Sequence, residues 1–206
     1  MTAAINTLRR VNARRTDLQA ETQRVELGLA ERLRERGFAV EVGYRPAVTD
    51  EDDAGEVDLI CHLDGALLLL EVKSGYIRST RHEVWLHRTN TLRKAAWQLR
   101  RKQVAVCSAL MTDLELRARL GYNGHEPGTD VCAWIVDTSI ELDGQWIDGY
   151  RIVSREVLEV ILRDEKRFLR RMDQDDDGRV SLFPDGFSFG RFVEVVETDQ
   201  LWRSLC

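Results

Sequence analysis

Two carboxylates and an ammonium are spaced along residues 56–73 so that they should converge on one point. The segment reads Glu-Val-Asp-Leu-Ile-Cys-His-Leu-Asp-Gly-Ala-Leu-Leu-Leu-Leu-Glu-Val-Lys, and its Asp64-Gly65 pair predicts two strands joined by a two-residue turn. In that register Asp58 faces Glu71, and Lys73 shares their face because side chains alternate along a strand. Like charges placed opposite each other destabilise a sheet. We therefore expect a divalent cation between the carboxylates, with the ammonium holding or activating a water beside it.

The same charges also allow a plainer interpretation. Glu56 falls opposite Lys73 in this register, so the two could form an ion pair on a solvated face, with the other carboxylates tolerated nearby. The neighbouring residues weigh against it, because both faces of the hairpin are apolar: Leu59, Ile60, Leu67, Leu68, Leu69 and Leu70. A strand that is apolar on both faces is central and buried, which puts the charges at the rim of a core.

The spacing of these residues resembles that of the PD-(D/E)xK nuclease superfamily. Asp58 is followed, after twelve residues, by Glu71-Val72-Lys73, with Glu-Val-Asp where many members have Pro-Asp. Lys73-Ser74-Gly75, then Trp85 and the run Lys94-Ala95-Ala96-Trp97-Gln98-Leu99, are most similar to the nuclease-related domain (NERD) and Mrr-like branches. The resemblance covers roughly residues 16–160. It implies an α/β fold with a restriction-endonuclease-like core, in which a mixed central sheet is flanked by helices in the order α-β-β-β-α-β.

The resemblance also implies an activity and the residues that carry it. We expect a magnesium- or manganese-dependent DNA endonuclease that hydrolyses phosphodiester bonds, as in DNA repair, recombination or defence. Asp58, Glu71 and the backbone carbonyl of Val72 would hold the metal, and Lys73 would orient the attacking water. Gln98, on the helix after the hairpin, would position water or phosphate.

Glu26 is a further candidate ligand with two interpretations. Related enzymes often take one more acidic residue from the helix before the hairpin, and Glu26 matches that position. It also borders the apolar stripe of this helix, where most glutamates simply reach out to water.

The positive charge of the chain is concentrated just after Lys73. The chain has a formal net charge of −5, which by itself would argue against a nucleic-acid enzyme, but phosphate binding depends on the local potential. Residues 78–102 carry a single acid, Glu83, and the following cations: Arg78, Arg81, Arg88, Arg93, Lys94, Arg100, Arg101 and Lys102. We predict that these residues bind the DNA backbone without reading its sequence, although a basic cluster can also be only a solvated helix face.

The remaining elements follow from periodicity and from helix and turn signals. Helices are expected at 17–36, 91–110 and 112–120, strands at 39–44, 131–137 and 150–153, a small hairpin at 75–79 and 83–87, and a last helix from the cap Ser154 to about Met172. Residues 182–206 should pack on the domain as a strand and cover, which makes the C-terminal addition a helix and β extension. The predicted organisation is a basic arm at 1–15, a nuclease-like domain at 16–165 and an extension at 166–206.

Bulk properties narrow the classes of protein. A chain of 206 residues with 43% apolar and 32% charged side chains is expected to form one soluble domain. No apolar run is long enough to span a membrane, and the N-terminus does not read as a secretory signal. The widely spaced cysteines, Cys61, Cys107, Cys132 and Cys206, are expected to be thiols, which fits the cytoplasm. A homodimer is left open.

Residues 173–178 repeat part of a calcium-binding pattern. Asp173, Asp175, Asp177 and Gly178 match the first half of such a loop, but Pro184 stands where the bidentate glutamate is needed. A solvated acidic turn is favoured.

Two other functions stay open at this point. The chain could be a nuclease-like module that binds nucleic acid or a partner without cutting, or an acidic regulatory protein in which the hairpin is only core. The sequence does not distinguish DNA from RNA, or duplex from branched or single-stranded substrates.

Overall fold

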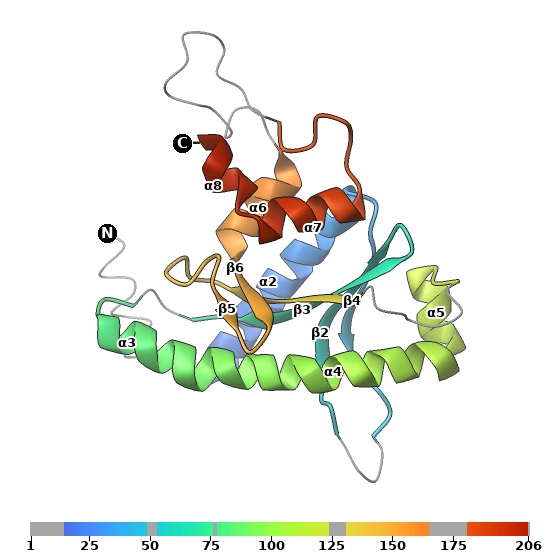
Figure 1. The fold of residues 1–206 in the computed structure, drawn as a ribbon. Helices are drawn as coiled ribbons and strands as arrows, with labels where there is room; N and C mark the ends of the chain where they lie inside the picture. The colour runs from blue at the N-terminus through green and yellow to red at the C-terminus, as the bar shows by residue number, and fades with distance from the viewer. Residues whose placement is uncertain (1–14, 49–52, 76–77, 124–130, 165–180, 206) are drawn as a thin grey trace.

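The computed structural model describes residues 15–48, 53–75, 78–123, 131–164 and 181–205. Within them the fold is α/β, and its strands form one mixed sheet in the order β1-β2-β3-β4-β6-β5. The strands are β1 (Ala39–Tyr44), β2 (Val57–Leu63), β3 (Ala66–Lys73), β4 (Val131–Asp137), β5 (Trp146–Ile147) and β6 (Tyr150–Ser154). β1, β2 and β3 are antiparallel neighbours, and β4 and β6 continue the sheet parallel to β3 (Figure 1).

The β2–β3 hairpin has the predicted turn and register. Asp64 and Gly65 both have positive φ, 54° and 81°, as a two-residue turn of this kind requires. The ladder pairs run from Leu63 opposite Ala66 to Leu59 opposite Leu70. Both strands are buried on both faces along this stretch, which confirms that the hairpin is central.

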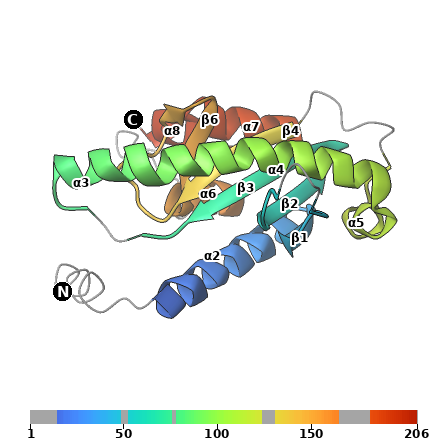
Figure 2. The ribbon, with the colours of Figure 1, turned by 90° about the horizontal axis from the view of Figure 1, so that it is seen from below.

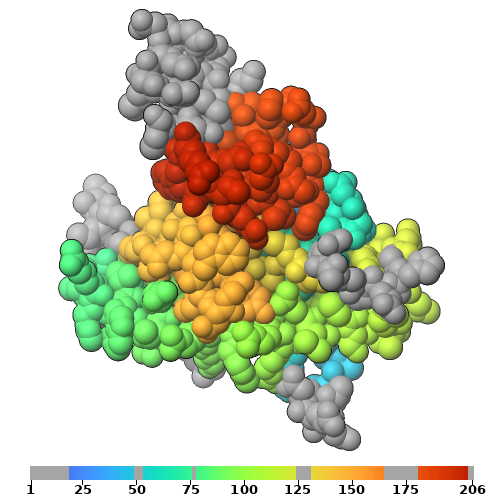
Figure 3. Space-filling view, viewed as in Figure 1, coloured from blue at the N-terminus to red at the C-terminus, as the bar shows by residue number. Residues whose placement is uncertain are grey.

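Helices cover both faces of the sheet. One face carries α2 (Arg15–Glu35), α6 (Arg155–Arg163), α7 (Phe189–Glu197) and α8 (Gln200–Leu205), and the other carries α4 (Arg93–Thr112) and α5 (Leu114–Leu120). Figure 2 shows α2 and α4 on opposite sides of the strands. In Figure 3, the surface of α4 adjoins the segment of β5 and β6, and the C-terminal helices lie above that segment.

The bounds of α2 (Arg15–Glu35) agree closely with the helix expected at 17–36. Val25, Leu29 and Leu33 of α2 are buried, as their helical spacing predicts. Gly37 follows with φ 91°, and the Phe38 N–H donates to Leu33 O at 3.1 Å, which closes the helix end.

The predicted hairpin at 75–79 and 83–87 is wrong, because residues 81–92 are helical. They form α3 (Arg81–Leu86) and the π-helical segment η1 (His87–Leu92), which continue into α4 as one long helix. Thr80 begins it with a capping box, in which its side chain accepts from the Glu83 N–H and the Glu83 side chain accepts from the Thr80 N–H. The Thr-x-x-Glu spacing carries this signal in the sequence, and it outweighs the polar run at 80–82 that had indicated a turn.

The C-terminal part also differs from expectation. α6 begins at the predicted Ser154 cap but ends at Arg163 rather than near Met172, because Asp164 adopts φ 45° and its side chain accepts from the Leu182 N–H at 2.8 Å. Residues 189–197 and 200–205 are helices rather than a strand. Their apolar residues Phe192, Val195 and Val196 recur at helical spacing and are buried in the cluster shared with α2 and α6.

Some expectations fall outside the described residues, namely the basic arm up to residue 14 and the acidic loop 173–178. Cys61, Cys107 and Cys132 are free thiols, and burial raises the pKa of Cys61. Among the helices that the structure describes, none has the length and apolarity to cross a membrane.

Candidate functional site

The candidate site forms where β2 and β3 separate. Their recorded ladder ends at Leu59 opposite Leu70, and the next backbone N–H of β3 that faces β2, that of Val72, donates to Asp58 Oδ2 at 2.7 Å. After Leu70, the backbone of β3 is no longer in the ladder with β2, and Glu71 and Lys73 continue the parallel ladder with β4. A side-chain carboxylate thus replaces a backbone carbonyl as the hydrogen-bond partner. This exchange draws Asp58 against the C-terminal end of β3.

Two ammonium groups meet the two carboxylates there. Lys73 Nζ donates to Glu71 Oε1 at 2.5 Å. Lys102, which comes from α4 across the sheet face, donates to Asp58 Oδ1 at 3.1 Å and to Glu71 Oε2. Glu71 is only 1% exposed and Lys102 only 3%. The predicted convergence of Asp58, Glu71 and Lys73 is therefore observed, with Lys102 as a cation between the carboxylates.

The charges in the cluster shift one another's pKa. Burial raises the pKa of Asp58, and the Glu71 carboxylate raises it further, while Lys102 opposes both effects. For Lys102, burial lowers the pKa, but the Asp58 and Glu71 carboxylates outweigh burial and the net pKa is raised. Lys102 is thus held as an ammonium beside a carboxylate that burial disfavours in its charged form.

Glu26 approaches this cluster from α2. One turn earlier on the helix, the Thr22 hydroxyl is hydrogen bonded to the Ser74 hydroxyl just after β3, which ties α2 to the site. The pKa of Glu26 is raised to about 7, first by burial and then by the Asp58 and Glu56 charges. Its side chain makes no hydrogen bond or ion pair with another described residue. Glu26 therefore lies within the electrostatic range of the carboxylates without being bonded to them.

The donor set can be compared with the needs of a magnesium ion. Within the residues that the structure describes, no three His, Cys, Asp or Glu side chains are grouped closely enough to hold a metal ion, so Glu26, Asp58 and Glu71 are not assembled as one ligand cluster. Magnesium, however, is commonly held by one or two carboxylates, with waters and substrate phosphates completing its shell. Asp58 and Glu71, already gathered around the Lys102 ammonium, fit that requirement.

Lys102, and not Gln98, is the α4 residue that reaches the carboxylates. Gln98 is half-buried and makes no hydrogen bond with another described residue, whereas Lys102 lies one turn further along the same flank. The sequence does carry a signal for this placement. Lys102 continues the stripe of Ala95, Leu99 and Val106, whose spacing marks the face that packs on the sheet. A lysine in that stripe must either find a buried partner or disrupt the core.

The basic residues predicted to bind DNA fall into three groups by the exposure of their side chains. Arg78, with a side chain 5% exposed, and Lys102 are buried in ion pairs, so neither is placed to contact a phosphate in this conformation. Arg101 is half-buried. The others are exposed on the long helix: Arg81, Arg88, Arg93, Lys94 and Arg100.

A buried network beside the site was not anticipated. Asp137, at the end of β4, is the ladder partner of Lys73, and its Oδ2 lies 2.7 Å from His87 Nε2 and accepts from the Ser139 hydroxyl at 2.8 Å. Arg78 Nη1 lies 3.7 Å from the same oxygen. Asp137 Oδ1 is buried with no hydrogen-bond partner in the described part of the chain. The sequence does carry a sign of this network, because Asp137 directly ends the apolar run Trp-Ile-Val of β4. The network ties the start of η1 to the strand ends that carry the site.

Glu56 does not pair with Lys73 as the plainer interpretation required. Its carboxylate instead pairs with Arg45, whose Nη2 lies 2.8 Å from Glu56 Oε2 on the exposed edge. Lys73 therefore forms its ion pair with Glu71 and not with Glu56.

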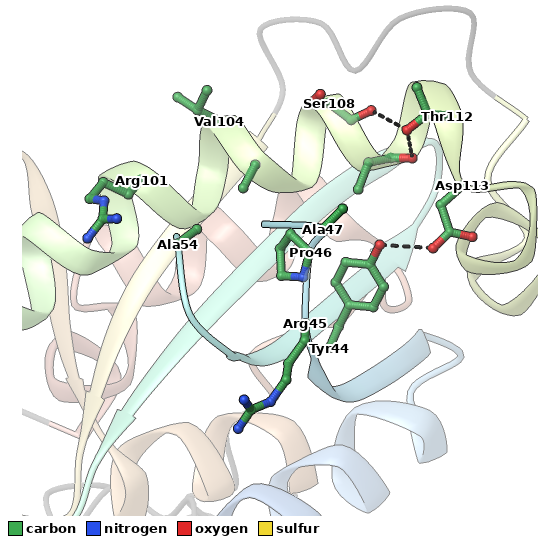
Figure 4. Close-up of a pocket in the computed structure, with 12 residues that line it drawn as sticks. Tyr44, Arg45, Pro46, Ala47, Ala54, Arg101, Val104, Ser108, Thr112 and Asp113 are labelled. Atoms are coloured by element: carbon green, nitrogen blue, oxygen red, sulfur yellow. Dashed lines mark hydrogen bonds between the residues drawn. The ribbon is translucent and has the colours of Figure 1, made fainter. Parts of the chain in front are cut away.

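A pocket of about 590 Å³ lies between the segment after β1 and the C-terminal half of α4 (Figure 4). Its walls include Pro46 and Val104, with Arg101 at one end, and the Tyr44 hydroxyl donates to Asp113 Oδ2 at 2.9 Å. Burial and this bond raise the pKa of Tyr44 to about 12. None of the lining residues belongs to the carboxylate cluster, so the pocket is a separate feature.

No family model, curated protein or solved structure matches this chain.

Proposed function

We propose that this protein is a magnesium- or manganese-dependent nuclease with a restriction-endonuclease-like core that hydrolyses the DNA backbone. The observation that supports this most directly is the meeting of Asp58, Glu71 and Lys73 at the end of a central strand, with Lys73 Nζ 2.5 Å from Glu71. The observed order of the core elements, α2, β1, β2, β3, α4 and β4, agrees with such a core.

Each residue has a role that follows from its chemistry. Asp58, Glu71 and the Val72 carbonyl would hold the metal, which when bound polarises the phosphodiester and lowers the pKa of a bound water. Lys73 donates a hydrogen bond at the place where negative charge develops on the phosphate oxygens. Lys102 neutralises the carboxylates when no metal is present, and Glu26 adds negative potential from the side. The exposed cations of the long helix would hold the backbone.

One observation favours a second function, a nuclease-like module that binds nucleic acid without cutting. Lys102 already bridges Asp58 and Glu71, and a buried ion-pair network can be complete without a metal. If the ammonium does not give way, the carboxylates remain structural and only the basic surface acts.

Cleavage assays separate the two functions. Purified protein should convert supercoiled plasmid to nicked and linear forms with magnesium or manganese, and not with EDTA. Glu71→Gln should abolish cleavage and Lys73→Met should slow it at least about 100-fold, with circular dichroism showing that the variants stay folded. Glu56→Gln is the matched control, because Glu56 pairs with Arg45 outside the cluster, and it should cut like wild type. Salt-sensitive DNA binding with no cleavage in either metal would support the second function instead.

A further inference from the structure

Two tryptophans are exposed along the helix that runs from α3 to α4. Trp85 is 57% exposed and Trp97 is 54% exposed, although large aromatic side chains are normally buried in a monomeric protein. Each has one ring face covered. The His82 ring stacks on Trp85 with centroids 5.9 Å apart and an interplanar angle of 20°, and the Arg101 guanidinium lies 4.4 Å from the centroid of Trp97. Both indoles are thus supported from one side while much of their surface stays open.

The π-helical segment aligns the two rings. Trp85 and Trp97 are twelve residues apart, while three turns of an α-helix take about 10.8 residues. Each π-type hydrogen bond spans one residue more than an α-type bond, so η1, which lies between them, absorbs the extra residue. The two tryptophans therefore lie on one stripe of the helix, three turns and about 16 Å apart along its axis.

Positive charge and position connect this stripe to the candidate site. Arg81, Arg88 and Lys94 are exposed on the same helix around the two rings. Arg101, stacked on Trp97, donates to the backbone carbonyl of Asp53, in the segment that leads into β2. Asp53 precedes β2, the strand that carries Asp58, and Arg101 is next to Lys102 on α4. The Trp97 end of the stripe is therefore less than two turns of α4 from Lys102, which reaches the carboxylates.

We propose that Trp85 and Trp97 form a stacking surface for the bases of an unpaired DNA strand, so that the substrate of this protein is single-stranded or branched DNA. The inference rests on the proposed nuclease function and specifies its substrate. A duplex keeps its base faces stacked inside and would need only the cations, whereas an unpaired strand presents bases to indole rings and phosphates to arginine and lysine. A span of about 16 Å is covered by about five stacked nucleotides at 3.4 Å each. The exposed cations Arg81, Arg88 and Lys94 around the two rings complement the phosphates of such a strand in charge.

Equilibrium binding in EDTA tests the inference apart from cleavage. Fluorescence anisotropy would measure the affinity of wild type and variants for a labelled single strand and for a duplex of the same sequence. Trp85→Ala and Trp97→Ala should each weaken single-strand binding by about 5- to 150-fold, the range found for base–aromatic stacking, and change duplex binding less than about twofold. Trp85→Phe and Trp97→Phe should restore most of the single-strand affinity. Trp202→Ala is the matched control, because Trp202 is 42% exposed on α8, away from the long helix, and it should bind like wild type.

Each other outcome decides against the stacking surface. Equal losses for single strand and duplex, or none for either, would overturn it while leaving nuclease activity to the plasmid assay. A wild-type dimer that becomes monomeric with Trp85→Ala or Trp97→Ala in sedimentation would show that the stripe is a protein interface. Absence of any DNA binding by wild type would remove the proposed function together with this inference.

Discussion

The Lys102 ammonium on α4 donates to the buried Glu71 carboxylate, and this bond links the helix layer to the end of the central strand β3. Taking such a pair out of water costs several kcal/mol per ion, which only good geometry and further hydrogen bonds offset. Here Asp58 and Lys73 supply those further bonds. Loss of the Lys102 ammonium would therefore leave the Asp58 and Glu71 carboxylates beside each other without the cation that bridges them.

Removing the Lys102 charge should destabilise the metal-free protein. Lys102→Met keeps the length of the side chain but leaves Asp58 and Glu71 facing each other, and we expect a loss of about 3 kcal/mol in EDTA, since breaking a buried pair costs this order. Urea unfolding measures the change. Lys94→Met, at an exposed position on the same helix, should alter stability by less than about 0.5 kcal/mol. If the two variants are equally stable, Lys102 is not the counter-ion of the carboxylates.

Lys73 should matter for turnover more than for folding. Its side chain is 23% exposed and contacts Glu71 at the mouth of the cluster. Loss of a donor aimed at developing charge lowers kcat by roughly 100- to 1,000-fold. We therefore expect Lys73→Met to cut DNA at least about 100-fold more slowly while unfolding within about 1 kcal/mol of wild type. Single-turnover rates on plasmid measure the first effect and urea titration the second. Wild-type rates for this variant would exclude Lys73 from catalysis.

The raised pKa of Glu26 predicts a pH dependence of stability. The folded-state pKa of about 7 exceeds the ordinary value of 4.5, so between these values the folded state binds more protons than the unfolded state. Stability from this residue is therefore present below about pH 4.5 and is lost as the pH rises towards about 7. In EDTA, Glu26→Gln should flatten the fall in unfolding free energy across this window. Glu31→Gln, exposed on the same helix, should keep the wild-type slope.

Local patterns in the sequence predicted the β2–β3 hairpin and the strands β1, β4 and β6 well, but not the short strand β5. The Asp64-Gly65 turn determines which residues of β2 and β3 are opposite, so the convergence of Asp58 and Glu71 follows from a short segment. The stop at Gly37 and the cap at Ser154 are also local signals. These features were predictable because each depends on backbone conformation within a few residues.

The residues that were missed depend on contacts between distant segments. Lys102 reaches Glu71 only because α4 crosses β3 at that turn, and helix registry against a sheet is not encoded by periodicity alone. His87 meets Asp137 because η1 adds a residue to the helix, which shifts every side chain before it. The error at 83–87 differs in kind, since the Thr80–Glu83 capping box is a local signal that the sequence itself carries.

The buried Asp137 network should support the site indirectly. Asp137→Ala removes the partner of His87 and Ser139, and it removes one of the two carboxylates that pair with Arg78, leaving Glu141 as the other. We expect a loss of about 3 kcal/mol, as for other broken buried ion pairs, measured by urea unfolding. Asp148→Asn is the control, since Asp148 lies 3.9 Å from the exposed Arg93, and asparagine, like aspartate, tolerates its φ of 48°. A surface pair of this kind contributes about 0–1 kcal/mol. Similar small losses for both would mean that the network does not hold the long helix in place.

Magnesium should reverse the effect of removing Lys102. At ten times its dissociation constant, a ligand that binds only the folded state stabilises it by about 1.4 kcal/mol, or about 3 to 5 °C in melting temperature for a chain of this size. In wild type the metal competes with the Lys102 ammonium for Asp58 and Glu71, so Lys102→Met should show a larger magnesium shift than wild type.

Asp58→Asn should be at least as stable as wild type in EDTA, because burial and Glu71 raise the pKa of Asp58. This variant should gain little stability from magnesium, because it has lost a charged ligand. Differential scanning fluorimetry with magnesium and with EDTA measures all three. Equal magnesium shifts in the three proteins would mean that the metal binds elsewhere, and the carboxylate cluster would then be an ion-pair network alone.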